Sequence, residues 1–166
     1  MRSSTETSAP ADLAGKYLTF RLEQESYGIR VLQVREIIRL ASITPVPRLP
    51  AYVRGVINLR GKIIPVLDVR IKFGLGRPVD SERACIIVVK LSDSNSLMGL
   101  AVDAVEEVSH FPAADIEPAP DFGTSVDTHY ILGLAKARNA VKTLLNIDCL
   151  FGADATAVAS AAGTAA

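Results

Sequence analysis

The chain carries twice the stretch that decides its fold: YVRGVINLRGKIIPVLDVRIKFG over residues 52–74 returns as YILGLAKARNAVKTLLNIDCLFG over residues 130–152. The two copies align without a gap. Chance likeness between two β-rich stretches is the alternative, but ordered, collinear matches favour an internal duplication. The identical pairs are Tyr52/Tyr130, Gly55/Gly133, Arg60/Arg138, Leu67/Leu145, Phe73/Phe151 and Gly74/Gly152.

The similarity extends upstream of this stretch in a weaker form. The spacing between the copies changes only in loop-like regions, as insertions into a duplicated chain would change it. We therefore expect two halves of similar structure. The upstream matches are Gly28, Val31, Val34 and Glu36 with Gly99, Val102, Val105 and Glu107, and residues 43–47 with residues 116–120.

Both halves are typical of short strands. Residues 16–23 alternate apolar and polar, while residues 84–91 form an apolar run that suits a strand buried on both faces. Residues 31–38 predict one helical turn followed by a strand. Further strands are expected over 27–29, 97–102, 52–59 and 63–67, and short helices over 68–73 and 146–151.

The last two strands of each half should form a hairpin. Arg60, Gly61 and Lys62 stand at its bend, and Asn139 replaces Gly61 in the second copy. Glycine and asparagine accept positive φ most readily, so we expect the same turn twice. The residues therefore predict an all-β fold of two small curled barrels, with two sheets packed as a sandwich as the alternative.

Composition bounds the organisation of the chain. Residues 1–15 are polar and predicted to be a disordered arm, residues 16–152 form the globular part, and residues 153–166 are an Ala-rich flexible tail. Within the globular part, one lobe covers about 16–83 and the other about 84–152. A secretory signal and a run long enough to span a bilayer are both missing, so we expect a cytoplasmic protein.

Charge and composition disfavour several classes of function. Eighteen basic residues balance eighteen acidic ones and aromatics are scarce, which argues against a nucleic-acid binder. Cys85 and Cys149 lie in apolar runs and are expected to be buried free thiols. His110 and His129 are too far apart for a helical metal pair. We expect no catalytic residues, no metal and no cofactor.

Three groups of residues remain without an enzymatic explanation. Glu106 and Glu107 are adjacent and should point to opposite faces of a strand. Glu36 and Arg60 recur as Glu107 and Arg138, and they form either a structural ion pair or a polar contact at the edge of a binding groove. An apolar surplus, part of which should be exposed to a partner or shared between lobes, comprises Val31, Val34, Ile37, Ile43, Val46, Val102, Val105 and Val108.

The segment GVINLRGKIIPVLDVR over residues 55–70 resembles the hallmark motif of the CheW family of chemotaxis coupling proteins. Residues 27–29, 34–37 and 116–120 support the resemblance, which covers about 16–152. Val69 departs conservatively from the leucine that many members carry. The resemblance implies two intertwined five-stranded SH3-like β-barrels with short helices, and a non-catalytic adaptor recruited to membrane-anchored receptor arrays.

The same resemblance implies two partners, the cytoplasmic tip of methyl-accepting chemoreceptors and the regulatory domain of the histidine kinase CheA, with no nucleic acid and no membrane insertion. The receptor tip, a helical hairpin, is expected in the groove between the barrels. A small-barrel nucleic-acid binder and an enzyme using the interlobe cleft are the alternatives. The expected receptor-binding residues are Val31, Val34, Glu36, Gly55, Arg60, Val102 and Val105, and the expected kinase-binding residues are Ile43, Thr44, Val46, Asp121 and Phe122.

Overall fold

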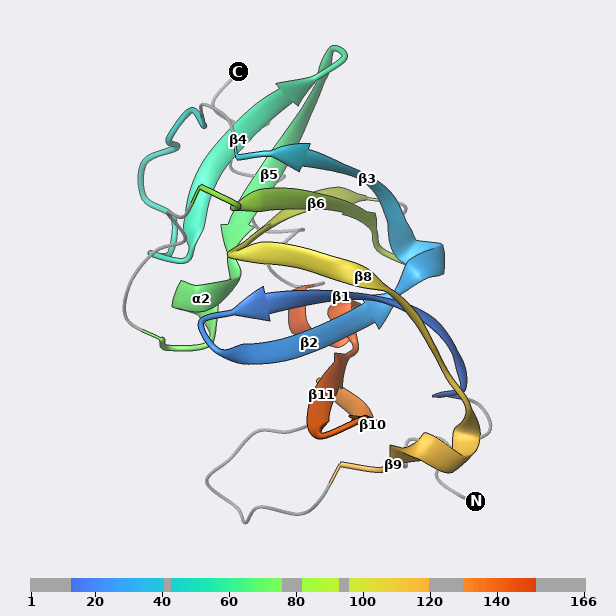
Figure 1. Cartoon of the computed structure of the whole chain (residues 1–166). Helices are drawn as coiled ribbons and strands as arrows, with labels where there is room; N and C mark the ends of the chain where they lie inside the picture. Colours follow the sequence, from blue (N-terminus) through green and yellow to red (C-terminus); the bar gives the residue numbers. More distant parts are fainter. Residues whose placement is uncertain (1–12, 41–42, 76–81, 93–95, 120–129, 152–166) are drawn as a thin grey trace, which may run out of the picture.

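The computed structural model describes residues 13–40, 43–75, 82–92, 96–119 and 130–151. These residues form two sheets with short helical turns, which confirms the all-β prediction (Figure 1). The strands are β1 (Gly15–Leu22), β2 (Glu25–Arg30), β3 (Val34–Arg39), β4 (Val53–Leu59), β5 (Lys62–Asp68), β6 (Cys85–Lys90), β7 (Leu97–Val102), β8 (Ala104–Phe111), β9 (Ile116–Glu117), β10 (Ile131–Ala137) and β11 (Ala140–Leu145). The helical turns are η1 (Val31–Gln33), α2 (Val69–Lys72), η2 (Ala113–Asp115) and residues 147–151.

The two halves of the chain exchange strands. One sheet has the order β8-β1-β2-β11-β10-β9 and the other β3-β6-β7-β5-β4. Each therefore joins the first two strands of one half to the later strands of the other half, through the parallel pairs β2–β11 and β7–β5. We call the first sheet barrel A and the second barrel B. The boundary near residue 83 divides the sequence repeats and not the barrels.

Matching contacts close the two barrels. In barrel B, Thr44 and Val56 exchange two backbone hydrogen bonds of 2.9 Å each, which ties the chain after β3 to β4. In barrel A, β9 pairs with β10 through Glu117 and Leu134, the positions equivalent to Thr44 and Val56. The repeated contact shows that the duplication seen in the sequence is also a duplication of structure.

The helical turns after each hairpin begin as the sequence predicted. The Asp68 carboxylate accepts a hydrogen bond from the Ile71 amide at 3.2 Å, and the Asn146 side chain accepts one from the Cys149 amide at 3.2 Å. These contacts satisfy amides that have no partner within a helix. The predicted turn followed by a strand over residues 31–38 is also confirmed, as η1 and β3.

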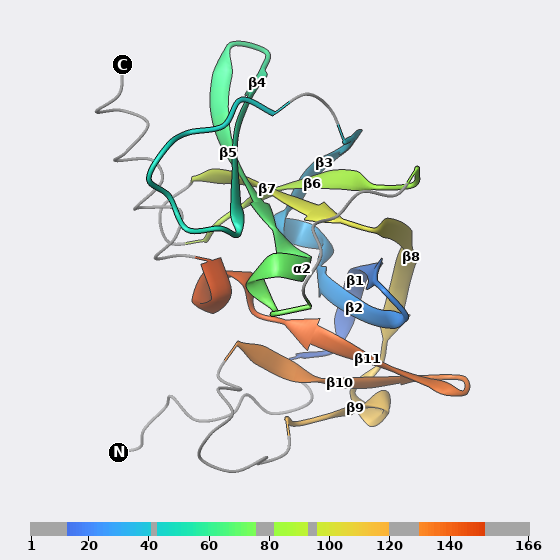
Figure 2. The same ribbon diagram turned by 90° about the vertical axis from the view of Figure 1, so that its left-hand side faces the viewer.

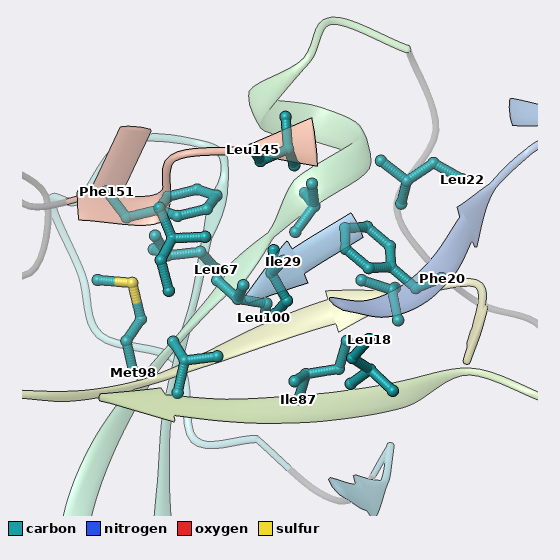
Figure 3. Packing of buried hydrophobic residues seen from close by; sticks show 14 of the residues in the cluster. Leu18, Phe20, Leu22, Ile29, Leu67, Ile87, Met98, Leu100, Leu145 and Phe151 are labelled. Carbon is teal, nitrogen blue, oxygen red and sulfur yellow. The ribbon is translucent and has the colours of Figure 1, made fainter. Parts of the chain in front are cut away.

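The largest core cluster lies between the two barrels (Figure 3). Leu18 and Phe20 of β1 and Ile29 of β2 meet Ile87 of β6 and Leu100 of β7 across it. A second cluster fills barrel B and a third fills barrel A. The predicted burial of the strand near residues 84–91 on both faces is confirmed, because β6 contributes to two clusters. Figure 2 shows β11 beside β2 and β7 beside β5, where the exchanged strands join.

The structure corrects three details of the sequence prediction. Leu13, assigned to the N-terminal arm, is fully buried, and its carbonyl accepts a 2.7 Å hydrogen bond from Tyr17 Oη. The two hairpin turns are not identical. Their first residues, Arg60 and Arg138, both have positive φ, but of the residues that follow them Gly61 has positive φ and Asn139 does not. The two thiols are not buried in the core. Cys85 is the first residue of β6 and is half-buried, and Cys149 is exposed on a helical turn.

Candidate functional site

Apolar side chains are exposed at the border between the two barrels. β3 and β8 are the first strands of their sheets, and each carries an exposed valine or isoleucine, Ile37 at 43% and Val108 at 53%. Ile37 pairs with Ile87 and Val108 pairs with Leu18, and Figure 3 shows Leu18 and Ile87 close together in the shared core.

Val34 and Val105 are half-buried neighbours of the exposed pair and pack on the same core cluster. We call the four residues Val34, Ile37, Val105 and Val108 the β3–β8 patch. Its members are equivalent in the repeat, Val34 to Val105 and Ile37 to Val108. The patch is therefore a pseudo-symmetric apolar surface on which both halves of the chain meet.

Two of the residues expected to bind the receptor are buried, and for them receptor contact stays a prediction. Val102 is fully buried in the core between the barrels. Gly55 is buried with φ of +139°, and a Cβ there would lie 2.0 Å from the Thr44 carbonyl oxygen. Gly55 is thus needed where the chain closes barrel B, and its recurrence as Gly133 follows from the repeated closure. Val31 is half-buried in η1.

Glu36 and Arg60 form an ion pair, as the sequence prediction that the two residues meet requires. Two nitrogens of Arg60 bind the two carboxylate oxygens of Glu36 at 2.7 and 3.0 Å. The side chains do not lie on adjacent strands, because Glu36 is on β3 and Arg60 is in the β4–β5 turn. The pair is not repeated in barrel A, where Glu107 is 3.8 Å from Lys142 Nζ.

The ion pair stands at the edge of a hollow of about 580 Å³ at the mouth of barrel B. This mouth lies between β3 and the β4–β5 hairpin, with β6 and β7 below it (Figure 1). Cations and apolar side chains both line it. The lining residues are Arg35, Glu36, Leu59, Arg60, Lys62, Ile64, Val88, Lys90 and Leu97.

The equivalent mouth of barrel A is neutralised from within. Lys142, at the position of Ile64, is 8% exposed and its Nζ lies 3.4 Å from Glu106 Oε1. Glu106 also accepts a 3.0 Å hydrogen bond from the Ser26 hydroxyl. Glu106 and Glu107 both approach Lys142, contrary to the prediction of opposite faces, because the register of β8 shifts next to Glu106.

The residues expected to contact the kinase are only partly described. Ile43 is half-buried against the core of barrel B, Thr44 is exposed apart from its bridge to Val56, and Val46 is half-buried. The three follow β3 on one segment. Asp121 and Phe122 lie outside the described residues. The structure therefore leaves the two predicted ends of the kinase contact as predictions.

The shared core bears on the enzymatic alternative. The space between the barrels, which that alternative needed as a cleft, is occupied by the shared core. Within the described ranges, no group of three or more His, Cys, Asp or Glu residues could hold a metal ion. Nor does any helix in them have the length and apolar character required to cross a bilayer.

Sequence reasoning missed several surface residues near the site. Leu32 is 86% exposed in η1, the helical turn that precedes β3. Arg35, Lys62 and Lys90 line the hollow with Arg60. The signal for Leu32 was an apolar residue out of phase with Val31 and Val34. The basic residues carried no such signal, because they lie on three different strands that only folding brings together.

The chain is similar in sequence and in structure to known proteins. A family model described as CheW-like domain matches residues 16–155. The chain is 34% identical over 143 residues to chemotaxis protein CheW of Klebsiella aerogenes, covering 86% of this chain and 85% of that protein. It is 31% identical over 134 residues to chemotaxis protein CheW of Rhizobium meliloti, with 81% and 85% covered. The crystal structure of scaffolding protein TtCheW from Thermoanaerobacter tengcongensis is similar, with a TM-score of 0.75 and 38% identity over 83% of this chain and 92% of that one.

Proposed function

The chain belongs to the CheW family of chemotaxis proteins, and from this membership we propose that it is a non-catalytic adaptor that couples methyl-accepting chemoreceptors to the histidine kinase CheA. It acts in the cytoplasm and joins the receptor arrays through its partners. Its own contribution in this proposal is binding surface, presented by two barrels that share a core.

The observation that carries this proposal is the β3–β8 patch. Exposed Ile37 and Val108 stand on a backbone fixed by the shared core, so an apolar partner can bury them without rearranging the barrels. Leu32, 86% exposed in the helical turn that precedes β3, is a further apolar side chain open to a partner. An amphipathic helix of the receptor would gain affinity chiefly by covering these side chains.

The ion pair of Glu36 and Arg60 borders this surface. Glu36 is next to Ile37 but on the opposite face of β3. Because β3 is the first strand of its sheet, a partner that passes over the edge of β3 reaches both the patch and the pair. Arg60 is 72% exposed and remains accessible on the outer side of the carboxylate. The pair then orients the partner, while the apolar patch supplies most of the binding free energy.

The kinase site is proposed on a separate segment. Ile43, Thr44 and Val46 follow β3 and cross to β4, and Asp121 and Phe122 complete the predicted contact. Separation of the two sites is what an adaptor requires, because it must hold receptor and kinase at the same time. Replacing Phe122 by serine should reduce kinase binding and leave receptor binding unchanged.

The test is a pair of binding titrations with a receptor cytoplasmic fragment and with the kinase. Ile37→Asp and Val108→Asp should each weaken receptor binding about tenfold or more, because a carboxylate would be buried without a partner. Val141→Asp is the matched control, since Val141 is 55% exposed on β11, away from the patch. Receptor affinity that is equal in all three folded variants would show that the patch is not the receptor site.

A further inference from the structure

The hollow at the mouth of barrel B holds positive charge that its own residues do not neutralise. Four cations line it, against the single carboxylate of Glu36, which is already bound by Arg60. The whole chain has eighteen basic and eighteen acidic residues, so this surplus of three charges is a local concentration. Among the described residues, no carboxylate forms an ion pair with Arg35, Lys62 or Lys90.

In barrel A, the equivalent mouth has its charges neutralised by an ion pair between its own residues. Arg35 of β3 and Glu106 of β8 occupy matching register shifts. In barrel A, Glu106 is bound by the buried Lys142. In barrel B, the position of Lys142 is taken by Ile64, which offers Arg35 no opposite charge. The cation at the bulge of barrel B is therefore available to a group from outside the chain.

We propose that the mouth of barrel B binds an acidic, amphipathic segment of the receptor, whose carboxylates meet Arg35, Lys62 and Lys90 and whose aliphatic side chain lies on the apolar floor. This inference rests on the proposed function and adds the chemistry of the partner. The floor consists of Leu59, Ile64, Val88 and Leu97.

The position of the hollow fits the same partner as the β3–β8 patch. Val34 belongs to the patch, and Arg35 and Glu36, the next residues of β3, line the hollow. The patch and the hollow lie on opposite faces of β3, and because β3 is the first strand of its sheet, one protein segment that passes over its edge can contact both. A nucleic acid would gain less, because its affinity depends on many cations over a long surface and the chain has no net charge.

The first test measures the binding of two labelled peptides to the full chain by fluorescence anisotropy. One peptide carries glutamate and leucine at helical spacing, and the other has lysine in place of every glutamate. The acidic peptide should bind and the basic one should not, and added salt should weaken the binding. Arg35→Gln and Lys62→Gln should each lower the affinity about threefold, within the range for exposed charges.

Arg39→Gln is the matched control for these variants. Arg39 is an exposed cation on the same strand and does not line the hollow, so its loss should leave the affinity for the peptide unchanged. If Arg39→Gln lowers the affinity for the peptide as much as Arg35→Gln does, the effect comes from the overall charge of the chain, and the proposal is overturned. Tighter binding of a single-stranded oligonucleotide, or of phosphatidylglycerol vesicles, at the same ionic strength would also overturn it.

The second test uses the receptor fragment and separates this inference from the proposed function. The double variant Arg35→Gln/Lys62→Gln should bind the fragment about tenfold more weakly than the parent, if two exposed charge contacts are lost. Parental affinity in the double variant would remove the hollow from the receptor site but leave the coupling function standing. Failure of the parent to bind the fragment would overturn the coupling function, while the peptide titrations would still report on the hollow.

Discussion

Arg60 reaches Glu36 from the tip of a hairpin, from a backbone conformation with φ of 52° that most residues avoid. The hydrogen bond and the charge of Glu36 raise the pKa of Arg60 above its usual value, so the guanidinium keeps its charge. The side chain is 72% exposed, and solvent therefore screens most of the attraction within the pair. The exposed ion pair is therefore better suited to contact a partner than to stabilise the fold.

A double-mutant cycle distinguishes these two roles. Glu36→Gln, Arg60→Gln and the double variant should all melt close to the parental temperature, because an exposed ion pair adds little stability. Their affinities for the receptor fragment should be coupled, since each single change removes the same contact. Thermal melts and binding titrations on the four proteins give the answer. Coupling in the melting temperatures alone would make the pair structural.

Tyr17 is a second residue whose environment has a measurable consequence. Its ring is fully buried, and burial raises the pKa of its hydroxyl, an effect that the nearby Arg30 partly offsets. Above about pH 10, the unfolded chain loses this proton before the folded chain does, so the free energy of unfolding should fall as pH rises. Below that pH the group makes no pH-dependent contribution.

Urea unfolding of the parent and of Tyr17→Phe, at pH 8 and at pH 11, tests this account. At pH 8 the variant should be less stable by about 1 kcal/mol, because the hydrogen bond to the Leu13 carbonyl is lost. Between the two pH values it should lose less stability than the parent. Some loss should remain, since burial also raises the pKa of Tyr27. Equal losses in both proteins would contradict the assignment to Tyr17.

At the scale of the elements, the closure of barrel B depends on one missing side chain. Gly55 has φ of +139°, and a Cβ there would lie 2.0 Å from the Thr44 carbonyl oxygen. Gly15 has a similar φ of +149°, but open space surrounds its Cβ position. Substituting these two glycines therefore distinguishes the cost of backbone strain, which both share, from the cost of a steric clash, which only Gly55 has.

Gly15→Ala and Gly55→Ala make a matched pair for urea unfolding. Both variants should lose stability from backbone strain, about 1 kcal/mol. Gly55→Ala should lose about 1–3 kcal/mol more, because the methyl group displaces the segment at Thr44. Similar losses would show that the bridge between Thr44 and Val56 yields without cost. If Gly55→Ala does lose the extra stability, a drop in its receptor binding follows from the disturbed fold and not from a lost contact.

The elements also show what the sequence could and could not predict. Strand positions were predicted closely, because alternation and apolar runs are local patterns with a direct structural cause. No structural reason for a glycine at residue 55 was visible in the sequence, because that reason is the close approach of Thr44, eleven residues away and opposite only in the fold. Glu106 and Glu107 were placed on opposite faces because a register shift leaves no mark in a single strand. The hollow was missed because its basic residues lie on different strands that only folding brings together.

At the scale of the whole molecule, exchange of strands makes the two barrels one cooperative unit. The polar ties between them follow the same symmetry. Arg70 of α2 binds Glu23 at 2.6 Å and Asp103 at 3.3 Å, and on the other side Asp148 binds the Ser92 amide at 2.8 Å. With the shared core, these contacts fix the relation between the β3–β8 patch and the mouth of barrel B.

Separating the repeats tests this cooperativity. A chain of residues 13–75 holds β1 to β5 but lacks the neighbours of β1, β2, β3 and β5 in the other half. Such isolated strand pairs are marginal in water, so neither this piece nor residues 82–151 should melt cooperatively by circular dichroism. An equimolar mixture should recover a single transition. A cooperative melt of either piece alone would show that a repeat can complete its own sheet.

Exchange of strands also has a consequence for ancestry. One repeat cannot finish a barrel, whereas two copies finish both, so the chain has the form of a swapped homodimer whose subunits became joined in one gene. In such an ancestor every substitution altered both mouths together. Joining the copies removed that constraint, and the two mouths now differ at several positions, among them arginine at residue 35 against glutamate at residue 106, and isoleucine at residue 64 against lysine at residue 142. Joining the two copies in one gene thus allows the mouth of one barrel to change while the mouth of the other stays the same.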